Sequence, residues 1–365
     1  MKAYDGTTRY SLDSCSALTS LAHLPALGGK LQSLSADHTT ALKSLGGLRD
    51  IPSLTAFSAD HSGLSDLSNL SALPALTWIA LQHCAQLKDA TPLGQLQKLE
   101  TVHLTDSAIT TLPAGWRGPV TSIVIKNCHG LTSLGLLPAD LVKLVCDESA
   151  GLTRLDGMQS CKKLEVISVQ ACPALQDLGT PHASLREIQA RGCMKLTSLE
   201  GLQTCHALAV AGIPTSVVDT HALKGLPSVM ICFDVNELGK PKVKGQLVPL
   251  PVAFIDAINV LPAVSLMLKG PSGSWHGSRH FDLYALSQFK TLTSLNFDEF
   301  DFHCNLAELA WLVPMENLQS LVFYPRGNMS HVLDGGVYDS IKKVKALQLK
   351  ICKEAKIKPP AHLNV

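Results

Sequence analysis

Residues Leu185–Leu196 read LREIQARGCMKL, and this stretch decides the fold. Its first, fourth and sixth positions, Leu185, Ile188 and Ala190, are apolar, which fits a short strand with one buried face. The ninth position, Cys193, is small and can hydrogen-bond the backbone of a tight turn. Leu196 then begins a second apolar set. The stretch therefore predicts a strand, an inward turn and a return segment.

The same frame recurs along the first two thirds of the chain. Successive copies begin 21 to 23 residues apart, by subtraction of their first residue numbers. A constant period of this length indicates a solenoid, in which each repeat buries its apolar face against its neighbours. A degenerate earlier copy fits at Tyr10–Leu12. The other copies begin at Leu31, Leu54, Leu76, Leu99, Val120, Leu141, Leu164 and Leu208.

In these copies, the ninth position of the frame holds five of the eleven cysteines. Its occupants are small groups that can stack as a ladder through the solenoid, so we predict free buried thiols instead of a disulfide scaffold. Cys161 and Cys205 fall late in the return segment, where we expect them to belong to the outer wall. The ninth positions are Cys15, Thr39, Ser62, Cys84, Ser107, Cys128, Ser149, Cys172 and Cys193.

The pattern LxxLxLxxCxxL resembles the leucine-rich-repeat consensus over roughly residues 7–235, in an irregular, cysteine-containing form that we associate with bacterial proteins. The resemblance implies an α/β solenoid. It would be a horseshoe with a continuous parallel β-sheet on the concave face, mostly short irregular or 3₁₀ convex segments, and longer helical repeats toward the C-terminus. It implies no particular ligand, because function resides in the variable positions of this scaffold.

Two regions are expected, 1–235 with regular repeats and 236–365 with longer, divergent ones and a C-terminal cap. Frames in the second region begin at Leu261, Leu292, Leu318 and Val344, and Cys352 falls on the ninth position of the last. Helix candidates are residues 252–260 and 341–346. We expect one continuous horseshoe, with a separate C-terminal domain as the alternative. Gly239–Pro251 and Gly270–His280 are insertions whose role stays open.

Composition narrows the class of function. The chain is 46% hydrophobic and 17% charged, which excludes disorder. A net charge of +1 gives no overall field for nucleic acid, and no apolar run approaches the roughly 18 residues of a membrane span. The start, MKAYDGTTRYSLDSC, has no apolar signal core. We therefore expect a cytoplasmic location or secretion without a cleaved signal, a monomer, and no nucleic-acid or membrane partner.

Signatures of catalysis and of cofactors are missing from the sequence. It contains no CxxC pair, HExxH helix, Walker loop, GxGxxG turn or GxSxG elbow. We predict a protein that is not an enzyme and needs no cofactor. Seven lysines near the C-terminus could attract nucleic acid or lipid headgroups, but the polar outer face that a last repeat needs is the preferred interpretation.

A column of histidines is the most distinctive candidate site. Asp37-His38 and Asp60-His61 occupy identical places in adjacent repeats, and Gln82-His83 follows in the next. Because parallel strands lie about 4.8 Å apart, the three imidazoles should stack at one edge of the sheet. The column could bind a partner, hold a metal or respond to pH. The preferred interpretation is a harmless duplicated tripeptide, and no metal is predicted.

The main functional hypothesis is a protein-interaction module that binds through the concave face, in an effector-, inhibitor- or immunity-like role. Mixed charge and a large aromatic side chain suit a protein partner. Two alternatives stay open: an enzyme with a site at residues 275–282, and a structural protein that assembles with itself. The predicted partner-binding residues are Asp37, His38, Asp60, His61, Trp78, Gln82, His83, His103, Asp106, Lys126, Asp147, Gln170, Gln189, Arg191 and Trp275.

Overall fold

The computed structural model describes residues 8–22, 24, 30–48, 51–226, 229–238, 247–262, 264–269, 282–298, 306–324 and 337–363. The chain forms two compact units, which are described separately. The first holds residues 1–188 and 204–207, and the second holds residues 189–203 and 208–365. Strand β9, Glu187–Gln189, lies at the division.

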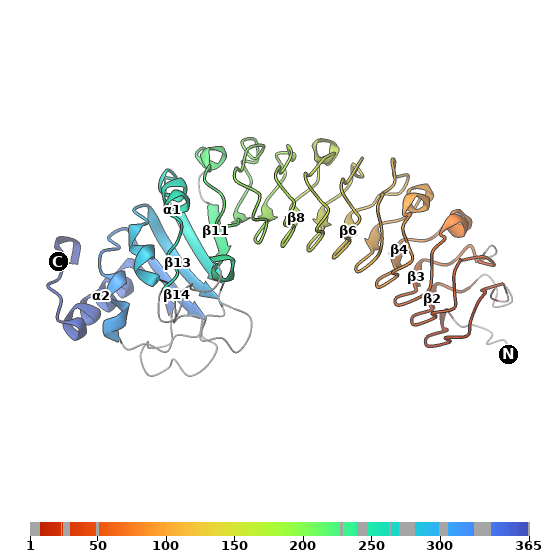
Figure 1. Cartoon of the computed structure of the whole chain (residues 1–365), viewed down its shortest axis with the longest axis horizontal. Helices are drawn as coiled ribbons and strands as arrows, with labels where there is room; N and C mark the ends of the chain where they lie inside the picture. The colour runs from red at the N-terminus through yellow and green to blue at the C-terminus, as the bar shows by residue number, and fades with distance from the viewer. Residues whose placement is uncertain are drawn as a thin grey trace. The chain divides into compact units, whose positions relative to one another are not determined.

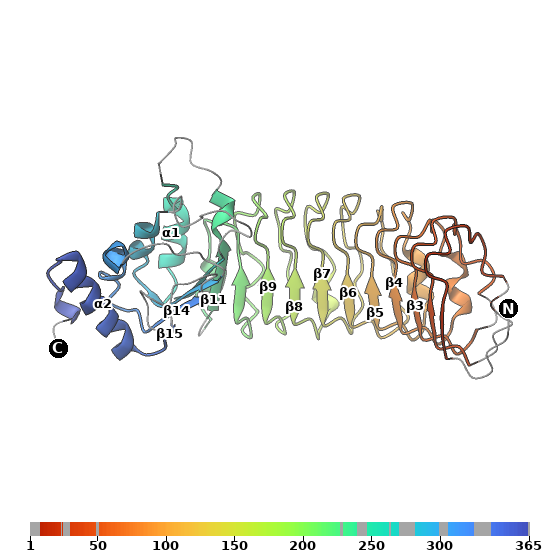
Figure 2. The ribbon, with the colours of Figure 1, turned by 90° about the horizontal axis from the view of Figure 1, so that it is seen from below.

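The first unit is a ladder of three-residue strands, each one repeat further along the chain (Figures 1 and 2). All neighbouring strands in it pair in parallel and in register, so Phe57 lies beside Leu34 and Ile79. The strands are β1 (Arg9–Ser11), β2 (Ser33–Ser35), β3 (Ala56–Ser58), β4 (Trp78–Ala80), β5 (Thr101–His103), β6 (Ser122–Val124), β7 (Lys143–Val145) and β8 (Val166–Ser168).

Burial in the first unit follows the predicted frame. Leu99, Val102 and Leu104 are fully buried, as are Leu131 and Leu134 of a return segment. The return segments carry short 3₁₀ turns in some repeats. The α/β solenoid with leucine-rich-repeat geometry is thus confirmed. These turns are η2 (Ser68–Ala72), η3 (Thr91–Gln95) and η4 (Met158–Ser160).

The ninth-position ladder is also confirmed. The Thr39 hydroxyl donates to the Ala36 carbonyl over 2.6 Å, within its own repeat. The Cys128 thiol donates to the Leu104 carbonyl of the preceding repeat over 3.1 Å, and its sulfur lies 3.2 Å from the Ser107 hydroxyl. A small polar group at this position therefore satisfies carbonyls that the turn leaves inside the solenoid, which explains why Thr, Ser and Cys interchange there.

The cysteines give a prediction for the native protein. The ten described cysteines are free, and nine of them are buried as predicted, but the prediction of a buried thiol is wrong for Cys15, which is exposed. Burial raises the pKa of Cys84, Cys128 and Cys146, so their reactive thiolate is scarce and inaccessible. Brief iodoacetamide treatment at neutral pH, followed by peptide mass spectrometry, is expected to label Cys15 at least tenfold faster than Cys128. Labelling of all three buried thiols in denaturant is the control, and equal native rates would contradict the ladder.

The second unit has longer strands and helices. Strand β10 (Val210–Gly212) pairs with β11, and β11 to β14 continue in parallel, while β15 (Val337–Tyr338) is antiparallel to β14. The frames predicted at Leu261, Leu292 and Leu318 are confirmed by strands β12 to β14. The helix predicted over residues 252–260 is confirmed by α1, which ends one residue earlier. The longer elements are β11 (Val229–Asp234), β12 (Val264–Lys269), β13 (Leu292–Asp298), β14 (Ser320–Tyr324) and α1 (Val252–Asn259).

Aromatic side chains fill the larger cross-section of the second unit. The rings of Phe297 and Phe323 stack with centroids 5.1 Å apart, and Trp311 packs edge-on against Phe297 at 5.9 Å. This packing accounts for the concentration of phenylalanine toward the C-terminus. The 3₁₀ segments of this unit are η5 (His221–Leu223), η6 (Val235–Leu238), η8 (Leu283–Gln288), η9 (Leu306–Leu312) and η11 (Ala361–Leu363).

The last predicted frame is wrong. Residues 344–349 do not form a strand, because Ile341–Ala355 is one helix, α2. Val344, Leu347, Gln348 and Ile351 are buried, and their spacing of three and four residues is that of a helix face. The helix prediction for residues 341–346 was therefore correct but too short, and Cys352 is a buried helix residue, not a turn residue.

Continuity of the sheet between the two units and the boundary at residue 235 stay predictions.

Candidate interaction face of the first unit

The histidine column forms at the turn that follows strands β2 to β4. The rings of His38 and His61 stack with centroids 4.6 Å apart and 7° between their planes, and those of His61 and His83 at 4.0 Å and 10°. All three side chains are exposed. His83 ends the column with its Nδ1 3.3 Å from Oδ2 of Asp106.

Backbone conformation explains why histidine occurs there. His38, His61 and His83 have φ values of 61°, 56° and 56°, in the left-handed region. Asp106 and Asn127 hold the same place in the next repeats, with φ of 54° and 55°. Asn, Asp and His are the side chains most enriched in this conformation outside glycine. The turn thus favours residues such as histidine at this position, whatever the column binds, but it does not require them, because Glu148 and Ala171 adopt the same conformation there with φ of 60° and 55°.

Stacking of the rings does not favour a metal site. Near-parallel imidazoles turn their faces toward one another, whereas a bound metal needs ring nitrogens that converge on one point. Among the residues that the structure describes, no group of three or more His, Cys, Asp or Glu side chains is arranged to hold a metal ion.

The aspartates beside the column have a structural task. Oδ1 of Asp37 accepts the backbone N–H of Asp60 over 2.8 Å, and Oδ1 of Asp60 accepts that of Gln82 over 2.7 Å. The Gln82 amide also donates to Asp60 Oδ2 over 2.9 Å. Each carboxylate therefore joins one repeat to the next. Their predicted role in partner binding stays a prediction, and the oxygens named here are already engaged.

Asp147 repeats this arrangement in a more buried place. Its Oδ1 accepts the Ser168 hydroxyl over 2.6 Å and the Gln170 backbone N–H over 2.9 Å, while Lys126 Nζ lies 3.5 Å from its Oδ2. The Asp147 carboxylate is thus held by three groups. Lys126, whose side chain is 45% exposed, is the member of this cluster that a partner can reach.

An apolar strip runs across the sheet face of the first unit, the side on which the first and third residues of each strand point. Strand register places Ala80 beside His103, His103 beside Val124, and Val124 beside Val145. The Trp78 ring meets His103 edge-on at 6.1 Å. Trp78, His103 and Val124 are partly exposed, whereas Ala80 and Val145 are buried.

The environment of His103 keeps the strip uncharged at neutral pH. Burial lowers the pKa of the His103 imidazole, with Asp60 opposing the shift and Lys143 adding to it. Exposed Lys143 and half-exposed Lys126 border the strip. The result is an aromatic and aliphatic centre with a polar rim, which is the usual composition of a protein-binding surface.

The remaining predicted residues lie elsewhere. Gln189 and Arg191 belong to the second unit and are partly buried. Gly212 makes room for Gln189, because a Cβ there would lie 2.0 Å from its side-chain oxygen. Trp275 and the rest of the proposed enzymatic segment up to residue 281 lie outside the described residues. Asp282 caps η8 by accepting the Tyr284 N–H over 3.0 Å.

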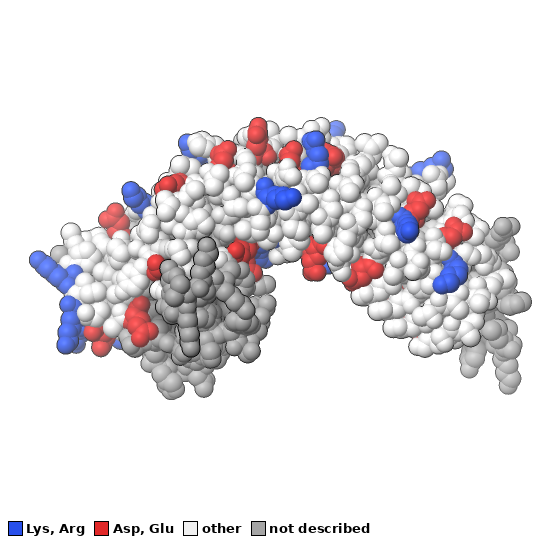
Figure 3. Space-filling view, viewed as in Figure 1, with Lys and Arg blue, Asp and Glu red and all other residues white. Residues whose placement is uncertain are grey.

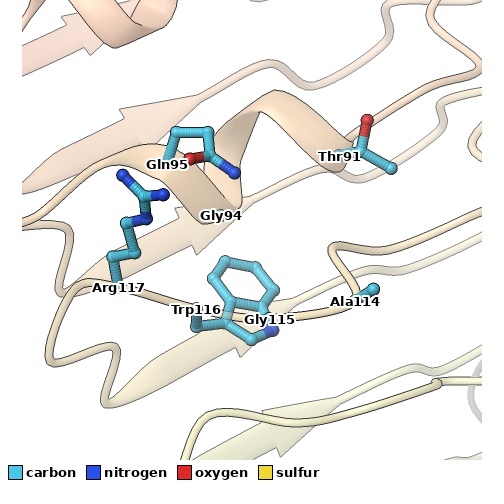
Figure 4. Close-up of a pocket in the computed structure, with 7 residues that line it drawn as sticks. All are labelled: Thr91, Gly94, Gln95, Ala114, Gly115, Trp116 and Arg117. Atoms are coloured by element: carbon cyan, nitrogen blue, oxygen red, sulfur yellow. The ribbon is translucent and has the colours of Figure 1, made fainter.

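One exposed aromatic site was missed from the sequence. Trp116 and Arg117 line a pocket of about 370 Å³ on the outer turns, with Gln95 and Arg117 to one side of the indole and Thr91 to the other (Figure 4). The indole N–H donates to the Leu136 carbonyl over 3.1 Å. The detectable signal was AGWRG at residues 114–118, which interrupts the leucines of the return segment.

Neither a search of family models nor one of curated proteins finds a match for this chain. Solved structures do show similarity. An internalin, InlF, from Listeria monocytogenes is 15% identical over 83% of this chain and 86% of its own, with a TM-score of 0.43. A leucine-rich-repeat protein from Leptospira interrogans is 16% identical over 88% and 84%, with a TM-score of 0.34.

TLR13, solved as a complex with ssRNA13, is 14% identical over 88% of this chain, which spans 62% of the TLR13 chain, with a TM-score of 0.28. These similarities concern the fold and bring no ligand with them. The constant period, the parallel register and the buried leucine frame, taken together, identify the chain as an α/β solenoid built of leucine-rich repeats.

Proposed function

We propose that this chain is a protein-interaction module, without catalytic activity of its own, whose partner docks on the sheet face of the first unit. The apolar strip of Ala80, His103, Val124 and Val145, together with Trp78, carries the proposal. His103 and Val124 are in register on adjacent strands and, with Trp78, are the partly exposed side chains that a partner can contact, while Ala80 and Val145 are buried at the two ends of the row. Trp is enriched among residues that dominate binding energy, especially where a polar rim excludes water.

The histidine column extends this surface along one edge. His38, His61 and His83 are exposed and mutually stacked, so they present a rigid set of ring edges that costs little conformational entropy to order. Lys126 adds a reachable positive charge next to the strip. An effector, an inhibitor and an immunity protein would all use such a face, and the chemistry of the face is common to the three roles.

The test is a double substitution, Trp78→Ala with His103→Ala. Both side chains are partly exposed and lie outside the leucine core, so the fold is expected to persist. With a partner isolated by crosslinking from source cells, we expect the dissociation constant to rise at least 30-fold, since an anchor of this kind contributes about 2 kcal/mol or more. Isothermal titration calorimetry measures the change.

Trp116→Ala is the matched control, because Trp116 is also a partly exposed tryptophan but lies on the outer turns. Its affinity for the same partner should equal that of the wild type. A double variant that binds normally, while Trp116→Ala does not, would move the binding site to the outer turns and reject the proposal.

A further inference from the structure

Helix α2 concentrates positive charge at the end of the second unit. Residues 341–358 hold seven lysines and one glutamate, a formal charge of +6, in a chain whose net charge is only +1. Figure 3 shows Lys and Arg side chains gathered over this helix. The remainder of the chain is therefore net negative, and the helix is a separate electrostatic feature.

The helical conformation arranges these lysines on one face. Lys342, Ala346, Leu349, Lys350 and Lys353 follow the spacing of one helix side, and all five are exposed. We call them the lysine face. If the segment were a strand, as its apolar residues first indicated, the same lysines would be divided between two sides. The helix therefore creates a surface that the sequence frame concealed.

The opposite face fixes α2 to the protein. Val344, Leu347 and Ile351 are buried, and the Gln348 amide donates to the carbonyls of Leu312 and Met315 over 2.7 and 3.1 Å. Lys356 ends the helix in the left-handed conformation, with φ of 55°. The lysine face is thus held rigidly outward, because the other side is occupied by packing and hydrogen bonds.

The charges of the lysine face are available to a ligand. Lys343, outside that face, pairs with Asp339 over 2.7 Å. Lys342, Lys350 and Lys353 form no ion pair with any described residue. Leu349 lies on the same face as these lysines and is 41% exposed, and Ile357, just past the helix, is 39% exposed. Exposed aliphatic groups therefore lie beside unpaired ammonium groups at this end of the second unit.

We propose that the lysine face binds the surface of an anionic lipid bilayer. Lysine ammonium groups meet acidic headgroups while their methylene stems and Leu349 reach the upper acyl region. A protein interface is a poorer fit, because lysine is depleted and Trp, Tyr and Arg are enriched there. Single-stranded nucleic acid is also a poorer fit, since α2 has no aromatic side chain for stacking and no arginine.

This contact is peripheral and does not involve spanning. In the described part of the chain, no helix has the length and apolarity to cross a bilayer. The inference revises the expectation from the sequence that no membrane takes part. It does not depend on the proposed protein-binding face, because that face belongs to the first unit and α2 belongs to the second.

The test uses the full chain and sedimentation with lipid vesicles at low salt. The wild type is expected to bind phosphatidylcholine vesicles that contain phosphatidylserine, to ignore pure phosphatidylcholine, and to be released by high salt. Lys342→Gln/Lys350→Gln/Lys353→Gln should weaken binding about 100-fold, at about fivefold per lysine. Leu349→Ser should weaken it several-fold with all charges kept.

Two controls make the result specific. Lys88→Gln/Lys98→Gln/Lys195→Gln removes three exposed lysines elsewhere and should bind vesicles as the wild type does. Trp78→Ala/His103→Ala should also bind them normally. Absence of binding to anionic vesicles, equal loss in both triple variants, or binding of single-stranded RNA in place of vesicles would overturn the proposal.

Discussion

Replacing Gly179 by alanine is expected to destabilise the first unit far more than the same replacement at Gly135. Both glycines are left-handed, with φ of 63° and 62°. At Gly135 a Cβ would meet nothing within 4 Å, so only the backbone penalty of about 1–2 kcal/mol applies. At Gly179 the Cβ would lie 2.0 Å from the Leu155 carbonyl oxygen, which is backbone and cannot rotate away.

The Gly179 variant must therefore shift one repeat against the next. Such overpacking typically adds about 1–3 kcal/mol, so the free energy of unfolding should fall by about 3 kcal/mol or more in total. Urea denaturation followed by circular dichroism measures both variants. Because the two sites share φ and residue type, their difference isolates the contact with Leu155. Equal losses at Gly135 and Gly179 would mean that the repeats are not packed this closely.

The buried frame was predictable from the sequence because it is periodic. Leu99, Val102 and Leu104 are buried for the same reason as their equivalents in every copy, so one correct alignment places them all. The histidine column followed from the same period and the strand spacing. Register in a parallel ladder is a local property that repetition enforces, and the sequence states it many times.

The features that could not be predicted occur only once in the chain, so no other repeat indicates them. Trp116 lies where a return segment loses its leucines, so no neighbouring repeat predicts its position. Val344, Leu347 and Leu349 match the strand frame by chance, while the buried Val344, Leu347 and Ile351 match a helix equally well. Short apolar runs do not separate these periods without knowledge of what packs against them.

Glu237 is the clearest case of a role that no periodicity reveals. In the regular repeats, the N–H of the left-handed residue donates to a carbonyl of the next repeat, as from His61 to Gln82 over 2.8 Å. At the start of the second unit, the Glu237 carboxylate accepts the N–H groups of Gly192 and Thr215 instead, over 2.5 and 2.8 Å. It comes from η6, more than 20 residues beyond either partner.

Stability of the second unit is therefore expected to depend on pH through Glu237. Burial raises the pKa of this carboxyl to about 7, and the nearby negative charge of Asp234 raises it further. The two backbone N–H groups and Arg191 favour the charged form and oppose this shift. The folded state thus keeps a proton that the unfolded state releases near its ordinary pKa of 4.5. The corresponding stabilisation is complete below pH 4.5 and is lost as pH rises through about 7.

A shift of this size corresponds to roughly 3 kcal/mol as an upper bound, since each pKa unit is about 1.4 kcal/mol. Urea unfolding of the wild type and Glu237→Gln, measured from pH 4.5 to 8, should show the wild type losing stability relative to the variant as pH rises. The variant cannot titrate, so the difference between the two isolates this one group from all others.

Glu200→Gln is the matched control, because Glu200 is an exposed glutamate of the same unit. Its stability should follow the wild type at every pH. If Glu237→Gln also runs parallel to the wild type across the whole range, then Glu237 has an ordinary pKa in the fold. The Gly192 and Thr215 N–H groups would then stabilise its carboxylate as strongly as burial disfavours it, and the prediction would be wrong.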